Sequence, residues 1–172
     1  MLAYDECFIS ISRQRTWFIN GTLFQAIEFA VKRFEELTLE ELYEILRLRV
    51  DVFVVEQDCP YPEIDGIDYD SIHVFSMENG RVTAYLRYFE SNGCMRIGRV
   101  IAADRGKGHG KELMTKGIDL IRTTTDADRI VLGAQVVAMG FYESLGFKAC
   151  SEPYDEDGIM HITMSLQLNK EK

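Results

Sequence analysis

Three glycines at alternate positions, with basic side chains among them, carry the clearest chemical signal in this sequence. They are Gly106, Gly108 and Gly110, in the stretch RVIAADRGKGHGKEL from Arg99 to Leu113. An apolar run precedes them and a helical pattern follows. Glycines let consecutive backbone N–H groups turn towards one anion, and the positive end of a following helix favours negative charge there. The stretch therefore predicts a phosphate-binding loop.

Two common phosphate-binding patterns do not fit this loop. A Walker loop would need glycine at Arg105 and a hydroxyl residue at Glu112. A dinucleotide-binding fingerprint would need its third glycine at Lys111. The pattern [RQ]-x-x-G-x-[GA] is met by Arg105, Gly108 and Gly110. Nothing in this pattern recruits a metal, so we expect phosphates to be held rather than cleaved. Taken alone, the loop fits a solvated turn equally well.

A second motif, QVVAMGFYESLGF, runs from Gln135 to Phe147. It resembles the N-x-x-A-x-x-x-Y-x-x-x-G-F motif of the GNAT acyl-CoA N-acetyltransferases, with Gln135 in place of the usual Asn. Four further blocks are similar to the ElaA-like branch of that superfamily: LRLRVDVFVVEQDCPYPEIDGID, IGRV, LGAQ and YDEDGIMH. The resemblance covers about residues 28–168. It implies a GNAT fold with acetyl-CoA as donor and an amine as acceptor.

The resemblance also implies how the donor would be held. Backbone N–H groups of the glycine loop would bind the pyrophosphate, and the edge of the preceding strand would pair with the pantetheine arm. Tyr142 would protonate the leaving thiolate, or alternatively it is a core aromatic residue. Gln135 would hydrogen-bond near the cofactor arm or cap a helix. The donor-binding residues predicted in this way are Val100, Ile101, Ala102, Arg105, Gly106, Lys107, Gly108, His109, Gly110, Lys111 and Gln135.

The acceptor must lose a proton before it attacks, because an ammonium group has no free electron pair. Glu56 is the first candidate base, since it ends an apolar run where desolvation can raise the pKa of a carboxyl group. It could equally pair with Arg47 or Arg49. His73 is the second candidate, with a packing role as its alternative. Proton removal relayed by water, without a dedicated base, is a third possibility.

Two acidic clusters flank the acceptor side in the fold that the resemblance implies. One spans fifteen residues that contain no Lys or Arg; its members are Glu56, Asp58, Glu63, Asp65, Asp68 and Asp70. The other consists of Glu152, Asp155, Glu156 and Asp157. They predict a strongly acidic acceptor groove, or alternatively two solvated loops. The predicted substrate-binding residues are Arg49, Phe53, Tyr61, Tyr154 and Glu156.

The elements that must position these residues follow from hydrophobic periodicity and turn signals. A capping box at Thr38–Glu41 opens a helix that reaches Val50, and further helices are expected after the glycine loop and over residues 135–145. Strands are expected at 28–34, 73–77, 82–89, 95–102, 129–134, 147–150 and 159–168. These elements predict an α/β (α+β) GNAT fold, with a mixed, mostly antiparallel sheet of six to seven strands flanked by helices. Residues 27–172 would form the N-acetyltransferase domain, and residues 1–26 a disordered or loosely packed extension.

Composition and charge narrow the range of partners. The 172 residues are 47% hydrophobic and carry a net charge of −9, which argues against nucleic acid and favours a small-molecule amine or a basic peptide. Four widely spaced cysteines suggest reduced thiols in the cytoplasm, and neither a metal site nor a membrane span is expected. The resemblance allows a homodimer. Two other functions stay open, namely a non-catalytic acyl-CoA sensor or assembly module and a regulatory domain that binds other phosphate compounds.

Overall fold

The computed structural model describes residues 16–19, 22–25 and 27–168, with the side chains of 27–168. The helices are α1 (Leu39–Arg49), α2 (His109–Thr124) and α3 (Met139–Glu143), and the short 3-10 or π segments are η1 (Phe34–Glu36), η2 (Val50–Glu56), η3 (Ile67–Asp70) and η4 (Val136–Ala138). The strands are β1 (Thr16–Ile19), β2 (Thr22–Gln25), β3 (Ala30–Arg33), β4 (Ile72–Glu78), β5 (Arg81–Ser91), β6 (Cys94–Ala102), β7 (Arg129–Gln135), β8 (Lys148–Ala149), β9 (Tyr154–Glu156) and β10 (Ile159–Gln167). Among the described residues, no helix has the length and apolar character needed to cross a membrane.

The main sheet is mixed and mostly antiparallel, as predicted. Its strands follow the order β3-β4-β5-β6-β7-β10-β8, and β9 pairs with β10. All seven predicted strands are present, and β9 is an eighth strand where an acidic turn was expected. The predicted extension over residues 1–26 lies mostly outside the described residues. Within it, β1 and β2 pair with each other as a separate two-stranded sheet.

Local signals explain where most elements begin and end. The Thr38 hydroxyl accepts from the N–H of Glu41, whose carboxylate accepts from the N–H of Thr38, so the predicted capping box is confirmed. Asn79 and Gly80 both have positive φ, as the two-residue turn between β4 and β5 requires. The helix predicted over 135–145 is wrong at its start. The chain continues as β7 through Gln135 and turns through η4 before α3 begins.

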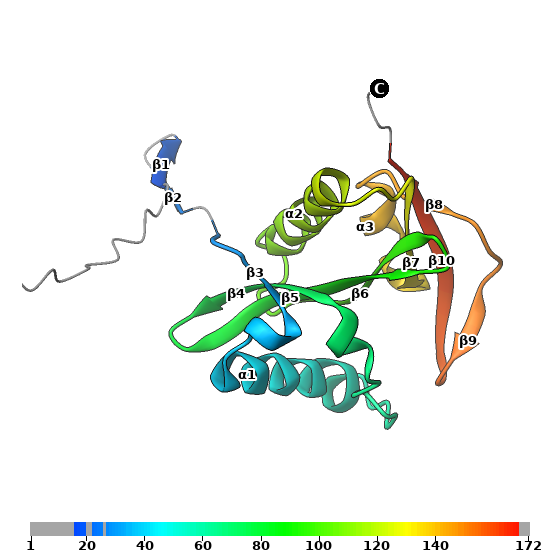
Figure 1. The fold of residues 1–172 in the computed structure, drawn as a ribbon, viewed down its shortest axis with the longest axis horizontal. Helices are drawn as coiled ribbons and strands as arrows, with labels where there is room; N and C mark the ends of the chain where they lie inside the picture. The colour runs from blue at the N-terminus through cyan, green and yellow to red at the C-terminus, as the bar shows by residue number, and fades with distance from the viewer. Residues whose placement is uncertain (1–15, 20–21, 26, 169–172) are drawn as a thin grey trace, which may run out of the picture.

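Helices cover both faces of the sheet, with α1 on one face and α2 and α3 on the other (Figure 1). The larger core joins the sheet to α2 through Leu113, Met114, Ile118 and Ile121. The smaller core joins the sheet to α1 through apolar side chains that include Ile45 and Leu48. We call these two sides the α2 face and the α1 face. Between the two faces lie β6 and β7, the strand pair that positions the candidate site.

Candidate functional site

Strands β6 and β7 are parallel neighbours that stay paired over a short distance. Their register joins Met95 to Ile130 and Arg96 to Val131, and no later pair is formed among the described residues. Beyond that point β6 remains paired with β5 as far as Ala102, while β7 remains paired with β10. Residues 97–102 therefore form an edge of β6 without a partner in β7. We call this segment the unpaired edge.

A β-bulge lies in the middle of the unpaired edge. Arg87 of β5 pairs with Gly98, whereas Tyr85 pairs with Ile101, so Arg99 and Val100 together face one residue of β5. Arg99 has a φ of 56°, in the left-handed region that β-branched and long side chains rarely adopt. Such strained positions occur often at functional sites. The bulge also reverses the alternation of side chains along β6. As a result Ile97 and Val100 pack on the α2 face, whereas Ile101 packs on the α1 face.

The glycine loop ends at the N-terminus of α2. Gly106 and Gly108 have φ values of 80° and 86°, and Gly108 is the N-cap residue of α2 without a capping side chain. Within the described part of the chain, the N–H groups of Gly108, His109 and Gly110 have no hydrogen-bond acceptor. Three consecutive free amides at the positive end of a 16-residue helix form a suitable phosphate site. The predicted backbone geometry of the loop is therefore present.

Two basic side chains of this loop, those of Arg105 and Lys107, are already paired with carboxylates. Arg105 donates to the carboxylate of Glu56, and Lys107 donates to Asp104 at 2.8 Å. The Asp104 carboxylate raises the pKa of the exposed Lys107. Lys111 lies on α2, where it lines a surface hollow of about 410 Å³ together with Phe29 and four other α2 residues. An anion would therefore meet backbone amides first, and the lysine and arginine side chains would have to exchange partners to reach it.

Helix α3 meets both the glycine loop and the end of β6. A β-carbon built on Gly110 would lie 3.6 Å from the ring of Phe141 and 3.7 Å from the β-carbon of Ala102. Tyr142, the next residue of α3, packs edge-on against Phe141 and Phe147, with ring centroids 5.1 and 6.1 Å away. These contacts bring together the loop, the end of the unpaired edge and the helix that carries Tyr142.

Tyr142 combines burial with a free hydroxyl. Burial raises its pKa to about 12, so the phenol stays protonated throughout the physiological range. Among the described residues, no hydrogen bond involves its hydroxyl group. The ring is packed as a core aromatic residue would be, and the hydroxyl keeps a proton that it can donate. The packing of Tyr142 matches the core interpretation, and its role as an acid stays a prediction.

Gln135 closes β7 and reaches across to the loop that follows η2. Its side-chain amide donates to the amide oxygen of Gln57 at 3.0 Å. This bond joins residues 78 positions apart and ties β7 to the end of η2. The capping role considered for Gln135 is wrong, because its side chain makes no cap bond to η4 or α3. Nothing in the sequence pattern had singled out Gln57.

The two candidate bases lie in very different surroundings. The side chain of Glu56 is 50% exposed and ion-paired with Arg105, so the expectation that burial activates it is wrong. His73 is fully buried, and its ring nitrogens lie 2.9 Å from the Tyr85 hydroxyl and 3.0 Å from the Asp68 carbonyl. Burial lowers the pKa of His73. Its geometry matches the packing alternative, and its role as a base receives no support from these contacts.

Half of the first acidic cluster is neutralised inside the protein. Three arginines and three acids form what we call the ion network, whose members are Arg49, Arg87, Arg99, Glu63, Asp65 and Asp68. Three positive and three negative charges cancel. The prediction of a strongly acidic acceptor groove is therefore wrong for this half of the cluster, because Glu63, Asp65 and Asp68 are bound by arginines from α1, β5 and β6. In the second cluster, Asp155, Glu156 and Asp157 remain exposed.

Among the predicted substrate-binding residues, Arg49 is the one whose prediction is most clearly wrong, because it is buried. Its side chain has no exposed surface, and it donates from Nε to Glu63 and from Nη1 to Asp68, both at 2.7 Å. Burial opposes its charge, but these carboxylates outweigh that effect and raise its pKa further. The pairing also holds acids in their charged form. Burial alone would raise the pKa of Asp65, yet hydrogen bonds from Arg87 and the Ile67 N–H lower it to about 2.

The other predicted substrate-binding residues fall into two neighbouring groups. Phe53 and Tyr61 flank the guanidinium of Arg99, with ring centroids 5.7 and 5.6 Å from its central carbon. Tyr154 stacks on His161 in the β9–β10 hairpin, and Glu156 lies beside the same histidine at 3.9 Å. The Cys59 thiol donates to the carbonyl of Asp157 at 3.4 Å. The loop after η2 and the last hairpin are therefore in contact; the groove that the resemblance places between them stays a prediction.

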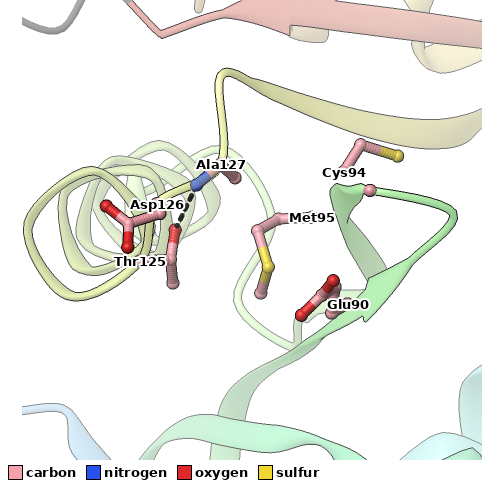
Figure 2. A pocket seen from close by; sticks show the side chains of 7 residues that line it. Glu90, Cys94, Met95, Thr125, Asp126 and Ala127 are labelled. Atoms are coloured by element: carbon pink, nitrogen blue, oxygen red, sulfur yellow. Dashed lines mark hydrogen bonds between the residues drawn. The ribbon is translucent and has the colours of Figure 1, made fainter.

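A separate pocket lies far from these residues. It has a volume of about 200 Å³ and is bounded by the β5–β6 turn and the C-terminal end of α2 (Figure 2). Its lining includes Glu90, Cys94, Met95 and Thr125, whose hydroxyl accepts a hydrogen bond from the N–H of Ala127. A 16-residue helix spans about 24 Å, which separates this pocket from the glycine loop. None of the predicted site residues lines it.

Three residues that contact the candidate site residues were missed by the sequence interpretation: Arg87, Arg99 and Gln57. A signal for the arginines was available in the acidic loop, since six acids without a basic neighbour need counter-charges from elsewhere. Arg87 and Arg99 stand among mainly apolar strand residues, where a charge requires a partner. The sequence could therefore have indicated that these charges pair, although not which arginine meets which acid.

Comparisons with known proteins agree with this geometry. Residues 42–168 match the model of the acetyltransferase (GNAT) domain family. The chain is 42% identical over 147 residues to a UPF0039 protein of Schizosaccharomyces pombe, covering 83% of this chain and 98% of that protein. It is similar to the crystal structure of Escherichia coli ElaA, with a TM-score of 0.75 and 40% identity over 81% of this chain and 99% of that one.

A crystal structure of an acyl-CoA N-acyltransferase from Pseudomonas aeruginosa is equally similar, with a TM-score of 0.75 and 39% identity over the same shares of the two chains. These matches confirm the expected fold. The chain therefore belongs to the GNAT acetyltransferase family, in its ElaA-like branch.

Proposed function

We propose that this protein is an acetyl-CoA-dependent N-acetyltransferase that acetylates a primary amine by direct attack in a ternary complex. The observation that carries the proposal is the meeting of three elements at Gly110. There the free amides of the glycine loop, the end of the unpaired edge and the helix of Tyr142 come into contact. The amides of the glycine loop suit phosphates, and the hydroxyl of Tyr142 offers a proton.

The chain's own groups would supply three functions to the reaction. The amides of Gly108, His109 and Gly110 would bind the pyrophosphate of the donor. The unpaired edge would hydrogen-bond the pantetheine arm as an added strand, and an N–H beside the bulge would stabilise the negative charge that develops on the thioester oxygen. Tyr142 would donate its proton to the departing thiolate. The donor supplies the acyl group to be transferred.

The bonds and protons of the reaction then balance. The neutral amine nitrogen forms a bond to the acyl carbon, and the carbon–sulfur bond breaks. The sulfur takes the phenolic proton of Tyr142, and the nitrogen releases one proton to solvent. Solvent then returns a proton to the Tyr142 phenolate, which restores the phenol. Because Glu56 is exposed and paired while His73 is buried and hydrogen-bonded, proton removal relayed by water fits the geometry best. The acceptor would be a small amine or the terminus or lysine of a basic peptide.

Calorimetric titration with acetyl-CoA tests the binding half of this proposal, and CoA release in a panel of primary amines tests the catalytic half. We expect saturable donor binding and thiol release that depends on the amine. Absence of binding at millimolar acetyl-CoA would refute the enzyme and the acyl-CoA sensor alike. Binding without release for any amine would leave the sensor as the better description.

A further inference from the structure

We propose that Arg99 binds an oxygen of the acceptor, so that the preferred acceptor is an amine that also carries a carboxylate or carbonyl group. This inference rests on the proposed function and names the class of its acceptor. Amino acids and the N-terminus of a peptide share this chemistry. A lysine side chain or a simple alkylamine lacks it near the reacting nitrogen.

The first step of the argument is that every acid of the ion network has a hydrogen bond from a buried arginine other than Arg99. Glu63 and Asp68 are both bound by Arg49, and Asp65 and Asp68 are both bound by Arg87. Each of the three acids therefore already has a buried arginine partner. The side chains of Arg49 and Arg87 are 0% and 2% exposed, whereas that of Arg99 is 21% exposed. Arg99 is therefore the arginine of the ion network that reaches the surface.

The second step concerns which donors of Arg99 are free. Its Nε donates to Glu63 at 2.7 Å, and its Nη2 donates to the Glu63 carbonyl and to Asp65 at 3.2 Å each. Within the described residues Nη1 has no hydrogen-bond partner, and it is not among the buried atoms that lack one. Nη1 therefore presents two N–H donors to the surface. A guanidinium has no acceptor capacity, so these donors call for an oxygen.

The third step is that the guanidinium is held in place before any ligand arrives. Three hydrogen bonds fix two of its nitrogens, and the rings of Phe53 and Tyr61 lie against it. Little side-chain freedom remains to be lost on binding, which favours recognition. The two acids bound to Arg99 are also bound by buried arginines, so the network as a whole carries no net charge to repel a carboxylate.

The fourth step is position. Arg99 is the bulged residue of the unpaired edge, next to Val100, and its side chain lies on the face that carries Phe53 and Tyr61. The proposed donor runs along that edge, so an acceptor oxygen held on Nη1 would bring the attached amine towards the acyl carbon. Arg99 would thus position the acceptor without taking part in the chemical step. The bulge that strains the Arg99 backbone thus also directs its side chain towards Phe53 and Tyr61.

The test compares an amino acid, its amide and the amine that lacks the carboxyl carbon, in two series: glycine, glycinamide and methylamine, and likewise alanine, alaninamide and ethylamine. Release of CoA is measured with saturating acetyl-CoA, and kcat/KM is expressed per concentration of unprotonated amine, because the three forms differ in amine pKa. We expect kcat/KM for the acid or the amide of each series to exceed kcat/KM for the bare amine by about 10-fold or more. This is the size of effect that a charge-assisted hydrogen bond produces. A preference for the acid indicates free amino acids, and a preference for the amide indicates peptide N-termini.

The variant Arg99→Gln should reduce this preference towards unity through KM, and Arg99→Lys should restore part of it. The exposed Arg122, paired with Asp119 at the far end of α2, provides the matched control Arg122→Gln, which should keep the wild-type preference. A merely structural role for Arg99 would lower kcat/KM for all three forms alike, and that result would overturn the inference.

The comparison of the three acceptor forms with the wild-type protein tests the inference even if the Arg99 variants do not fold. Equal kcat/KM for the three forms would overturn this inference and leave the proposed function intact. Absence of CoA release with any amine would overturn both.

Discussion

The α2 face and the α1 face of the sheet build their halves of the candidate site from different atoms. On the α2 face, the proposed donor site consists of backbone N–H groups in a glycine loop and of one tyrosine four residues before a glycine. On the α1 face, the proposed acceptor side consists of charged side chains that meet from residues 14 to 36 positions apart. A backbone site depends on local conformation, whereas a side-chain network depends on how the whole chain is folded. The four predictions that follow test this difference, beginning with the largest effect.

Replacement of Tyr142 by Phe tests whether the α2 face supplies a proton as well as a binding surface. The substitution removes only the hydroxyl and keeps the ring packed against Phe141 and Phe147. We expect kcat to fall by about 10²–10⁴-fold, the usual contribution of general acid catalysis, with little change in acetyl-CoA affinity. Steady-state kinetics and calorimetry measure the two quantities. Tyr43→Phe, on the outside of α1, is the control; an equal rate in both variants would contradict the acid role.

Replacement of Arg49 by Met tests whether the α1 face depends on its buried charges. The change leaves Glu63 and Asp68 buried with one arginine each instead of two. Removing one partner from a buried ion pair typically costs about 3–5 kcal/mol in unfolding free energy. Urea denaturation measures the loss. In the control Arg122→Met, an exposed pair with Asp119 is broken, and the cost should stay below about 1 kcal/mol. Similar losses in the two variants would show that the network adds no special stability.

Acid should weaken the ion network on the α1 face. The pKa of Asp65 is about 2 in the folded protein and near 3.8 in an unfolded chain. A lowered carboxyl pKa stabilises the fold above the unfolded value, and this contribution disappears as the pH falls from about 4 to about 2. Because the Asp65 side chain is 25% exposed, solvent screening reduces this contribution to about 1–2 kcal/mol. Urea midpoints at pH 7 and pH 3 measure the effect. Asp65→Asn should depend less on pH than the wild type, and an unchanged dependence would rule out this origin.

A single glycine tests the backbone character of the donor side. Gly108 has a φ of 86° and open space where a β-carbon would stand, so Gly108→Ala adds strain without a clash. We expect unfolding free energy to fall by about 1 kcal/mol and acetyl-CoA to bind more weakly. Gly140 lies within α3, also with open space but without positive φ. Gly140→Ala should therefore raise unfolding free energy slightly, because alanine favours helices. Equal effects at both glycines would show that the left-handed conformation at Gly108 is unimportant.

The sequence by itself determined the elements and the donor half of the site. Capping at Thr38, the Asn-Gly turns and the alternation of β4 to β6 are local signals, and they predicted seven strands and the start of α1 and α2. The glycine loop and the Tyr142 motif are likewise contiguous stretches, and the sequence was enough to predict that each lies between a strand and a helix. Backbone preferences and neighbouring residues decide such features before the chain is folded.

Only the tertiary structure decided the acceptor half. The acidic loop predicts a negative surface until Arg49, Arg87 and Arg99 are brought to it from α1, β5 and β6. Glu56 and His73 have the right chemistry in the sequence, yet one is exposed and the other is buried in the core. Charge and pKa depend on desolvation and on partners a few ångströms away. Those distances arise from the packing of distant segments, which no local pattern contains.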